Sequence, residues 1–248
     1  MEEHKTITTP QRTEHIKRLP SLGGGGGGFS GGFLIWDLDG TLLDTLQDLA
    51  NSTNYALRTW GLPERTIDEV RKFVGNGVRM LMTRAVPQGE EHPHFEEIFD
   101  TFKSHYVEHC QDNTCLYPGI AETLQTLKAR GIRMAVVSNK LQAGVTELHE
   151  AWFKDTIDVA IGERPEVRRK PAPDMVMAAL SEQASSAQEP IRAVYIGDSE
   201  VDIQTAANAG IPCISVLWGF RDKDFLIQNG ATTLVSHPQE IISLVIGE

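Results

Sequence analysis

The chain is poor in cysteine, has fewer basic than acidic residues, and lacks any long apolar run. Its three cysteines, Cys110, Cys115 and Cys213, are odd in number and do not form a CxxC pair, which predicts free thiols in a reducing compartment such as the cytoplasm. No stretch of about 18 apolar residues occurs, so we expect no membrane span. The N-terminus also lacks the apolar block of a secretion signal.

The shortage of positive charge bears on the choice of ligand. The net charge is -11, from 23 basic and 34 acidic residues. A phosphate backbone needs clustered Lys and Arg, so nucleic acid is not expected as a main partner. Arg164, Arg168 and Arg169 do cluster, but the acidic balance favours a surface loop near a site over an RNA contact. We expect a small ligand, and an anionic one would need a local positive site.

Residues 1–32 are expected to form a flexible tail. They are polar and include six consecutive glycines, Gly23 to Gly28, which cannot offset the entropy lost on ordering. The alternative is a phosphate-binding glycine loop. No predicted strand precedes the tract and no GK[ST] follows it, so a linker is the preferred interpretation.

The next part of the chain divides into a short strand, a helical block and a longer α/β segment. Residues 44–115 read as mostly helical, and we expect no strand there. Residues 66–69, Thr-Ile-Asp-Glu, resemble a capping box, which predicts the start of a helix. Apolar residues recur at helical spacing in two stripes, Leu46, Leu49, Thr53, Ala56, Leu57 and Trp60, then Phe95, Ile98, Phe99, Phe102 and Tyr106.

From Tyr117 onward, short apolar strands alternate with helices. This alternation predicts a parallel sheet covered on both faces. The fold class is therefore α/β, with a Rossmann-like core of residues 33–43 and 116–248 and a small helical cap domain of residues 44–115 inserted after the first strand. Strands are expected at 132–137, 159–161, 193–196, 211–216 and 233–235, and helices at about 141–149, 174–183, 200–209 and 238–246.

Two carboxylates follow the first strand directly. Phe33 to Trp36 is a short apolar run, and it is followed by Asp37 and Asp39. Residues two apart in a strand point the same way, so both acids should lie at the carboxyl end, where open α/β sheets bind ligands. Gly40 then permits a sharp turn. Clustered acids repel unless a divalent metal offsets their charge.

Three further polar groups follow or adjoin later strands. Ser138-Asn139-Lys140 offers a hydroxyl and backbone amides for phosphate, or is a set of ordinary turn residues. Lys170 is a candidate cation or a solvated loop residue. Asp198 either joins the site or caps the next helix, and Asp202 lies one turn further on. Together they supply the carboxylates, hydroxyl and cation that phosphoryl transfer needs.

With these four motifs, the chain resembles the haloacid dehalogenase superfamily of phosphohydrolases. The resemblance covers Phe33 to the C-terminus, and the helical block resembles that family's α-helical cap. Within the family, phosphoglycolate phosphatases are the most similar branch. The segments that carry this narrower resemblance are Phe73-Val74-Gly75-Asn76-Gly77, Tyr117-Pro118-Gly119, Ser138-Asn139-Lys140, Gly219-Phe220-Arg221-Asp222 and Asn229-Gly230-Ala231.

The resemblance implies a role for each core motif. Asp37 would attack phosphorus, and Asp39 would act as general acid and then general base. Mg²⁺ would be held by Asp37, by the backbone carbonyl of Asp39 and by Asp198. Residues expected to hold phosphate are Ser138, Asn139 and Lys170, while Asp202 would support the metal site or orient Lys170.

In the cap, Gly75, Asn76 and Gly77 would approach a small carboxylated substrate, or form a plain turn between helices. Arg79 is a candidate anion contact or a solvated helix residue. His105 and His109 have a spacing that zinc ligands use, but no complete second pair follows.

The leading hypothesis is a Mg²⁺-dependent phosphatase for a small phosphorylated metabolite, with 2-phosphoglycolate preferred, acting as a monomer or homodimer. The alternatives are a sugar phosphomutase, and a pyrophosphatase or nucleotide phosphatase, of the same superfamily. A binding module without turnover is a third possibility, against which the intact acidic and basic residues argue.

Overall fold

Six parallel strands form the sheet of the computed structural model, which describes residues 32–184 and 192–247. Their order is β5-β4-β1-β6-β7-β8, so β1 is central and the chain builds outward on one side before restarting on the other. This is the doubly wound order, whose ligand site lies where the direction reverses, at the carboxyl ends of β1 and β6. The strands are β1 (Phe33–Trp36), β4 (Arg133–Leu141), β5 (Val159–Glu163), β6 (Ala193–Gly197), β7 (Cys213–Val216) and β8 (Leu234–Val235).

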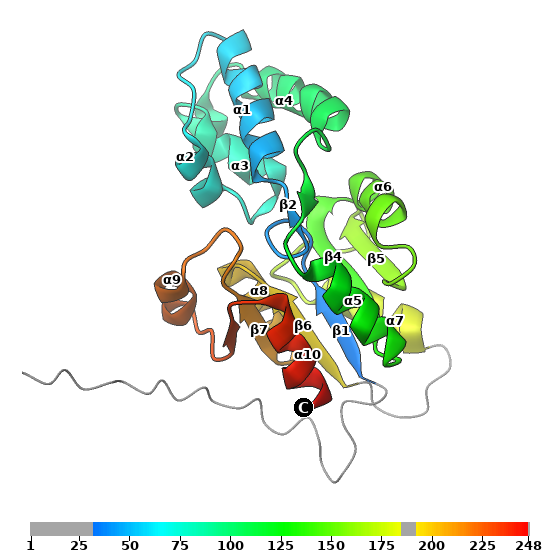
Figure 1. Cartoon of the computed structure of the whole chain (residues 1–248). Helices are drawn as coiled ribbons and strands as arrows, with labels where there is room; N and C mark the ends of the chain where they lie inside the picture. Colours follow the sequence, from blue (N-terminus) through cyan, green and yellow to red (C-terminus); the bar gives the residue numbers. More distant parts are fainter. Residues whose placement is uncertain (1–31, 185–191, 248) are drawn as a thin grey trace, which may run out of the picture.

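Helices cover both faces of the sheet (Figure 1). The side chains of β1 alternate between the two faces: Leu34 and Trp36 pack on one face, and Phe33 and Ile35 on the other. The first face is covered by α5 (Ile120–Ala129), α6 (Gln142–Trp152) and α10 (Pro238–Ile246), and the second by α7 (Asp174–Ala184) and α8 (Glu200–Ala209). All four β1 side chains are fully buried, as expected for a central parallel strand.

A group of four helices lies beyond the carboxyl ends of the strands, at the top of Figure 1. It has its own apolar core, to which the predicted stripe of Phe95, Phe99 and Phe102 contributes. The predicted capping box at Thr66 and Glu69 is present. These helices are α1 (Leu46–Thr59), α2 (Ile67–Phe73), α3 (Gly77–Ala85) and α4 (Phe95–His109), with a short 3₁₀ turn at Gly89–Glu91.

The predicted fold class is confirmed, and three details differ. β4 extends through Ser138-Asn139-Lys140 to Leu141, beyond the predicted end at 137. Helix α9 (Lys223–Gln228) was not predicted. The expectation of no strand in 44–115 is wrong at both ends, where β2 (Leu43–Asp44) pairs with β3 (Cys115–Leu116). Two-residue strands depend on a distant partner and leave no local periodicity.

The proposed boundaries of the cap coincide with this small ladder, and they remain a prediction. The predicted tail of residues 1–32 lies outside the described residues except for Gly32. Among the helices described, none combines the length and apolar character that crossing a lipid bilayer requires.

Asp48 connects, through hydrogen bonds, the chain segment that enters the helical group to the segment that leaves it. Its carboxylate is buried and accepts hydrogen bonds from the backbone N–H groups of Asn113 and Thr114 and from both of their side chains. If one carboxylate oxygen is replaced by an amide NH₂ group, that position can no longer accept, and several of these donors lose their acceptor. The start of α1 is thereby tied to the end of the helical group.

Asp48→Asn is expected to lower the free energy of unfolding by about 3 kcal/mol, because an NH₂ group would face N–H donors in a buried site. Urea denaturation measures this. The matched control is Asp68→Asn, an exposed carboxylate 4.0 Å from Arg71, which should change stability by less than about 0.5 kcal/mol. Equal stabilities for the two variants would contradict this account of the connection.

Candidate active site

The carboxyl ends of β1 and β6 bring two distant acids together. Asp37 follows β1 and Asp198 follows β6, and these strands are neighbours in the sheet. After Asp37 the chain turns tightly, with Leu42 and Leu43 donating their N–H groups to the carbonyl of Leu38. The turn needs Gly40, since its φ is +90° and a Cβ there would lie 2.6 Å from Asp198 Oδ2.

Asp37, Asp198 and Asp202 form a buried acidic cluster, with carboxylate oxygens within 4.8 Å of one another. The ammonium of Lys170 lies between two of them, 2.7 Å from Asp37 Oδ1 and 2.7 Å from Asp202 Oδ1. One cation therefore faces three carboxylates. When all are ionised, the cluster holds more negative than positive charge, in a site from which water is largely excluded.

Burial and the crowding of negative charge shift the pKa values of the cluster. Burial and the Asp202 carboxylate raise the pKa of Asp37 well above its usual value, although Lys170 opposes the shift. Burial and Asp202 also raise the pKa of Asp198 to about 7. Burial alone would lower the pKa of Lys170, but Asp202 and Asp37 raise it well above its usual value. Lys170 is therefore a fixed positive charge. The carboxylates around it, when ionised, carry more negative charge than this one ammonium balances.

Each carboxylate is oriented by hydrogen bonds. Asp198 accepts from the backbone N–H of Phe220 at 2.7 Å and from the hydroxyl of Thr41 at 3.2 Å. Asp202 uses one oxygen for Lys170 and the other for the N–H and hydroxyl of Ser199. Ser199, not Asp198, caps α8. The geometry of Asp202 thus fits the role of orienting Lys170.

The donor set fits a hard divalent cation. Carboxylate oxygens are the ligands that Mg²⁺ prefers, and the unmatched negative charge is what a bound cation would offset. Within residues 32–184 and 192–247, no other group of three His, Cys, Asp or Glu side chains comes together in this way. The ring centroids of His105 and His109 lie 4.3 Å apart with the rings tilted by 31°, but no third ligand joins them in the part of the chain described.

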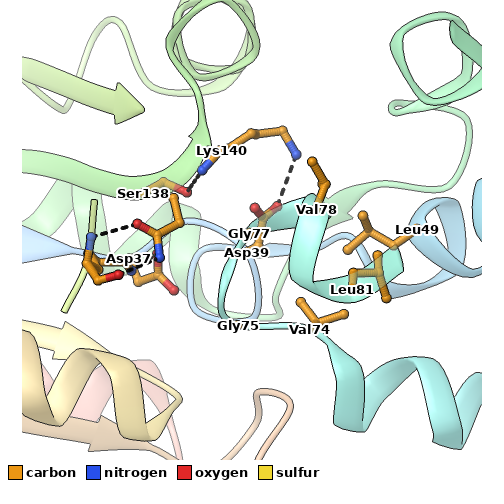
Figure 2. A pocket seen from close by; sticks show the side chains of 12 residues that line it. Asp37, Asp39, Leu49, Val74, Gly75, Gly77, Val78, Leu81, Ser138 and Lys140 are labelled. Atoms are coloured by element: carbon orange, nitrogen blue, oxygen red, sulfur yellow. Dashed lines mark hydrogen bonds and ion pairs between the residues drawn. The ribbon is translucent and has the colours of Figure 1, made fainter. Parts of the chain in front are cut away.

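A small pocket of about 40 Å³, room for only a few water molecules, lies against this cluster. One side is polar and comes from the strand ends, while the other is apolar and comes from the helical group (Figure 2). The polar residues are Asp37, Asp39, Ser138, Asn139, Lys140 and Lys170, and those on the helical side are Leu49, Val74, Gly75, Gly77, Val78 and Leu81.

The end of β4 supplies the second predicted motif. The Ser138 hydroxyl oxygen accepts from the N–H of Lys140 at 3.2 Å, and its own O–H has no acceptor among the described residues. It is therefore available to donate to a ligand oxygen. The Asn139 side chain is already used, since it accepts from the N–H of Lys170 and donates to the carbonyl of Lys170. Asn139 holds the Lys170 backbone in place.

Two of the four predicted cap residues reach the pocket. Gly75 and Gly77 line it, with φ values of +119° and +81° that favour glycine. Asn76 and Arg79 are not among its lining residues. The side-chain amide oxygen of Asn76 accepts a hydrogen bond from the Arg84 guanidinium. Arg79 forms ion pairs with Glu90 and Glu96 and lies over the rings of Phe95 and Phe99.

Sequence reasoning gave no role to Lys140, which the structure places in the pocket. Its ammonium lies 3.3 Å from Asp39 Oδ1 and 2.6 Å from the hydroxyl oxygen of Tyr106, on α4. The available signal was its place two residues after Ser138, on the same side of an extended strand.

Arg221 was also missed, and it links the sheet to the helical group. It donates to the carbonyls of Arg71 and Val74, at 2.9 and 2.6 Å, and pairs with Glu200. Its neighbour Phe220 packs in the core of the helical group and donates its N–H to Asp198. One loop therefore contacts both the acidic cluster and the segment that leads into Gly75.

Gly219→Ala is expected to disrupt this loop, because a Cβ there would lie 2.2 Å from Asp198 Cβ and 2.4 Å from the Gly40 carbonyl oxygen. We expect a loss of about 3 kcal/mol in stability and a lower affinity for divalent cations, measured by denaturation and calorimetry. The control is Gly144→Ala in α6, where the nearest neighbour is at 3.5 Å and a gain of about 0.5 kcal/mol is expected. A Gly219→Ala protein as stable as the control would refute the close approach.

Comparison with known proteins adds independent findings. The sequence model of the family described as haloacid dehalogenase-like hydrolase matches residues 34–216. The chain is 31% identical to the phosphoglycolate phosphatase of Aquifex aeolicus, over 86% of this chain and 95% of that protein. It is 37% identical to that of Rhodobacter capsulatus, over 76% and 85%. A crystal structure of a Lactobacillus delbrueckii protein, 36% identical, superposes with a TM-score of 0.79, covering 87% of this chain and 98% of that one.

Proposed function

The chain belongs to the haloacid dehalogenase-like hydrolase family, and on that premise we propose that it is a Mg²⁺-dependent phosphatase that hydrolyses 2-phosphoglycolate through an aspartyl-phosphate. The observation that carries the proposal is the pairing of Asp37 with Lys170 inside a buried acidic cluster, beside Asp39 and a small pocket. The choice of substrate rests on the two relatives compared above, both of which are phosphoglycolate phosphatases. A small phosphorylated metabolite in the cytoplasm is the expected ligand.

The metal would be held by Asp37, Asp198 and the backbone carbonyl of Asp39. Mg²⁺ would supply the positive charge that lets a phosphate dianion approach a carboxylate. Lys170 contributes a permanent charge to the same end, because it contacts Asp37 directly and stays protonated. Asp202 holds that ammonium in place from the other side.

Asp37 is proposed as the nucleophile. Its carboxylate oxygen bonds to phosphorus while the bond from phosphorus to the ester oxygen breaks. Asp39 gives its proton to the departing alkoxide. It then takes a proton from the water that attacks the aspartyl-phosphate, which releases inorganic phosphate and restores Asp37. Asp39 lies at the edge of the pocket with its carboxylate 3.3 Å from Lys140, so both acids line one small space.

Phosphate oxygens are proposed to bind the free O–H of Ser138 and the ammonium of Lys170. The helical group, proposed as a cap of residues 44–115, closes the pocket with Leu49, Val78 and Leu81 and limits water. Gly75 and Gly77 are proposed to let the cap backbone come near the substrate.

The test is a panel of phosphate esters assayed with Mg²⁺ or with EDTA. It contains 2-phosphoglycolate, β-glucose 1-phosphate, pyrophosphate and a nucleoside monophosphate. We expect phosphate release from 2-phosphoglycolate with kcat/KM at least about tenfold above the others, loss of activity in EDTA, and recovery on adding Mg²⁺. Isomerised sugar phosphate without free phosphate would instead indicate a phosphomutase. Full activity in EDTA would contradict the metal.

A further inference from the structure

The pocket is lined by two cationic side chains among the described residues, Lys140 and Lys170. Lys170 contacts Asp37 and Asp202 in the acidic cluster, and its charge is already assigned to the phosphoryl group. Lys140 lies outside that cluster. It belongs to the polar side of the pocket, next to Asp39, and the mechanism above gives it no task.

Lys140 is buried but incompletely paired. Its side chain is 7% exposed, and an ammonium has three N–H donors. Two partners are present in the described structure: the Tyr106 hydroxyl oxygen at 2.6 Å and Asp39 Oδ1 at 3.3 Å. The contact with Asp39 is longer than a strong charge-assisted hydrogen bond. A buried cation with spare donors beside a pocket can bind an anion there.

In the described part of the chain, the opposite wall contributes no cationic side chain to the pocket. Leu49, Val78 and Leu81 are apolar, and Arg79 is held by Glu90 and Glu96 outside the pocket. A second anionic group on the substrate would therefore meet a cation with a spare donor on the side that bears Lys140.

The position of Lys140 also selects where that second anion sits on the substrate. Asp39 is the proposed donor to the ester oxygen, and Lys140 contacts Asp39. In 2-phosphoglycolate, the carboxylate is attached to the carbon that bears the ester oxygen. A cation beside the acid that protonates this oxygen is thus close to that carboxylate. An acid with its carboxylate several carbons further from the ester oxygen would place that group away from the contact between Asp39 and Lys140.

We propose that Lys140 is a specificity-determining residue, which binds the carboxylate of a substrate whose carboxylate and phosphate share one carbon. This rests on the proposed phosphatase function and assigns its substrate class. Tyr106 on α4 holds the ammonium from the helical side, at 2.6 Å with the ammonium 4.8 Å above its ring, so recognition depends on the helical group being in place.

The test compares 2-phosphoglycolate with ethyl phosphate, in which a methyl group replaces the carboxylate, in saturating Mg²⁺. For each of the wild type, Lys140→Met and Lys140→Arg, the ratio of the two kcat/KM values is measured. Lys140→Met is expected to lower the ratio about 10- to 100-fold, the loss of one charge-assisted hydrogen bond. Lys140→Arg should keep most of the wild-type ratio.

An unchanged ratio in Lys140→Met would overturn the inference, since a residue that acts only through Asp39 or through folding slows both esters alike. Thermal unfolding of each variant accompanies the kinetics. If the wild type released phosphate from neither ester, the phosphatase proposal would fail, and this inference with it.

Discussion

Asp37→Asn should lower kcat with 2-phosphoglycolate by a factor of about 10⁴ or more, because the amide group is a poor nucleophile and Asp202, the other carboxylate in contact with Lys170, is not among the residues that line the pocket. The protein should still fold. Replacing one of three crowded carboxylates by a neutral group relieves repulsion in the cluster. Phosphate release in Mg²⁺ and thermal unfolding are the two measurements.

A matched control separates the loss of the nucleophile from the loss of a charge. Asp100→Asn removes a carboxylate from the helical group, where it pairs with Lys103 at the surface. It should leave kcat within about twofold and stability within about 0.5 kcal/mol of the wild type. Turnover by Asp37→Asn within tenfold of the control would contradict the role of Asp37.

The second large effect is expected for Lys170→Met, which should lower both stability and activity. Its ammonium contacts Asp37 and Asp202 in a site that is almost wholly buried. Removing one partner of a buried ion pair leaves uncompensated charge and costs about 3–5 kcal/mol. We expect a loss of that size in urea denaturation without metal, and kcat/KM lower by about 10³-fold or more.

Part of the stability lost by Lys170→Met should return on adding Mg²⁺, since a divalent cation would again balance Asp37 and its neighbours. The control is Lys128→Met, which removes a half-exposed ammonium paired with Asp158 and should cost at most about 1 kcal/mol. If both variants lost the same stability, Lys170 would not be the charge that holds the cluster together.

The sequence predicted the acidic part of the site because its signals are local. An apolar run ending in Asp37 and Asp39 with Gly40 behind them indicates a buried strand and a turn, and both are present. The meeting of Asp37 with Asp198 followed from one further rule, that parallel strands present their carboxyl ends at one edge. Lys170 and Asp202 lie in contact at the same edge, and their roles there remain predictions.

Contacts between the sheet and the helical group were beyond sequence reasoning. Arg221 reaches the carbonyl of Val74, 147 residues away, and no periodicity encodes that approach. The same holds for the Asp48 contacts and for the two-residue strands β2 and β3. Each depends on how segments far apart in the sequence meet.

Arg79 and Lys140 show the same limit within the site. The sequence offered Arg79 as either an anion contact in the cap or a solvated helix residue, and acids 11 and 17 residues further along occupy its guanidinium. Lys140 had been noted only as part of a turn-like motif. Its importance depends on the position of Tyr106, a residue from another unit.

The central claim is that Asp37 carries the phosphoryl group. Wild-type protein in Mg²⁺ is mixed with 2-phosphoglycolate, quenched within milliseconds and treated with borohydride, which reduces an aspartyl-phosphate to homoserine. Peptide mass spectrometry should then find homoserine at position 37, and aspartate unchanged at 39 and 198. Active enzyme whose position 37 remains aspartate at every time point would contradict the account.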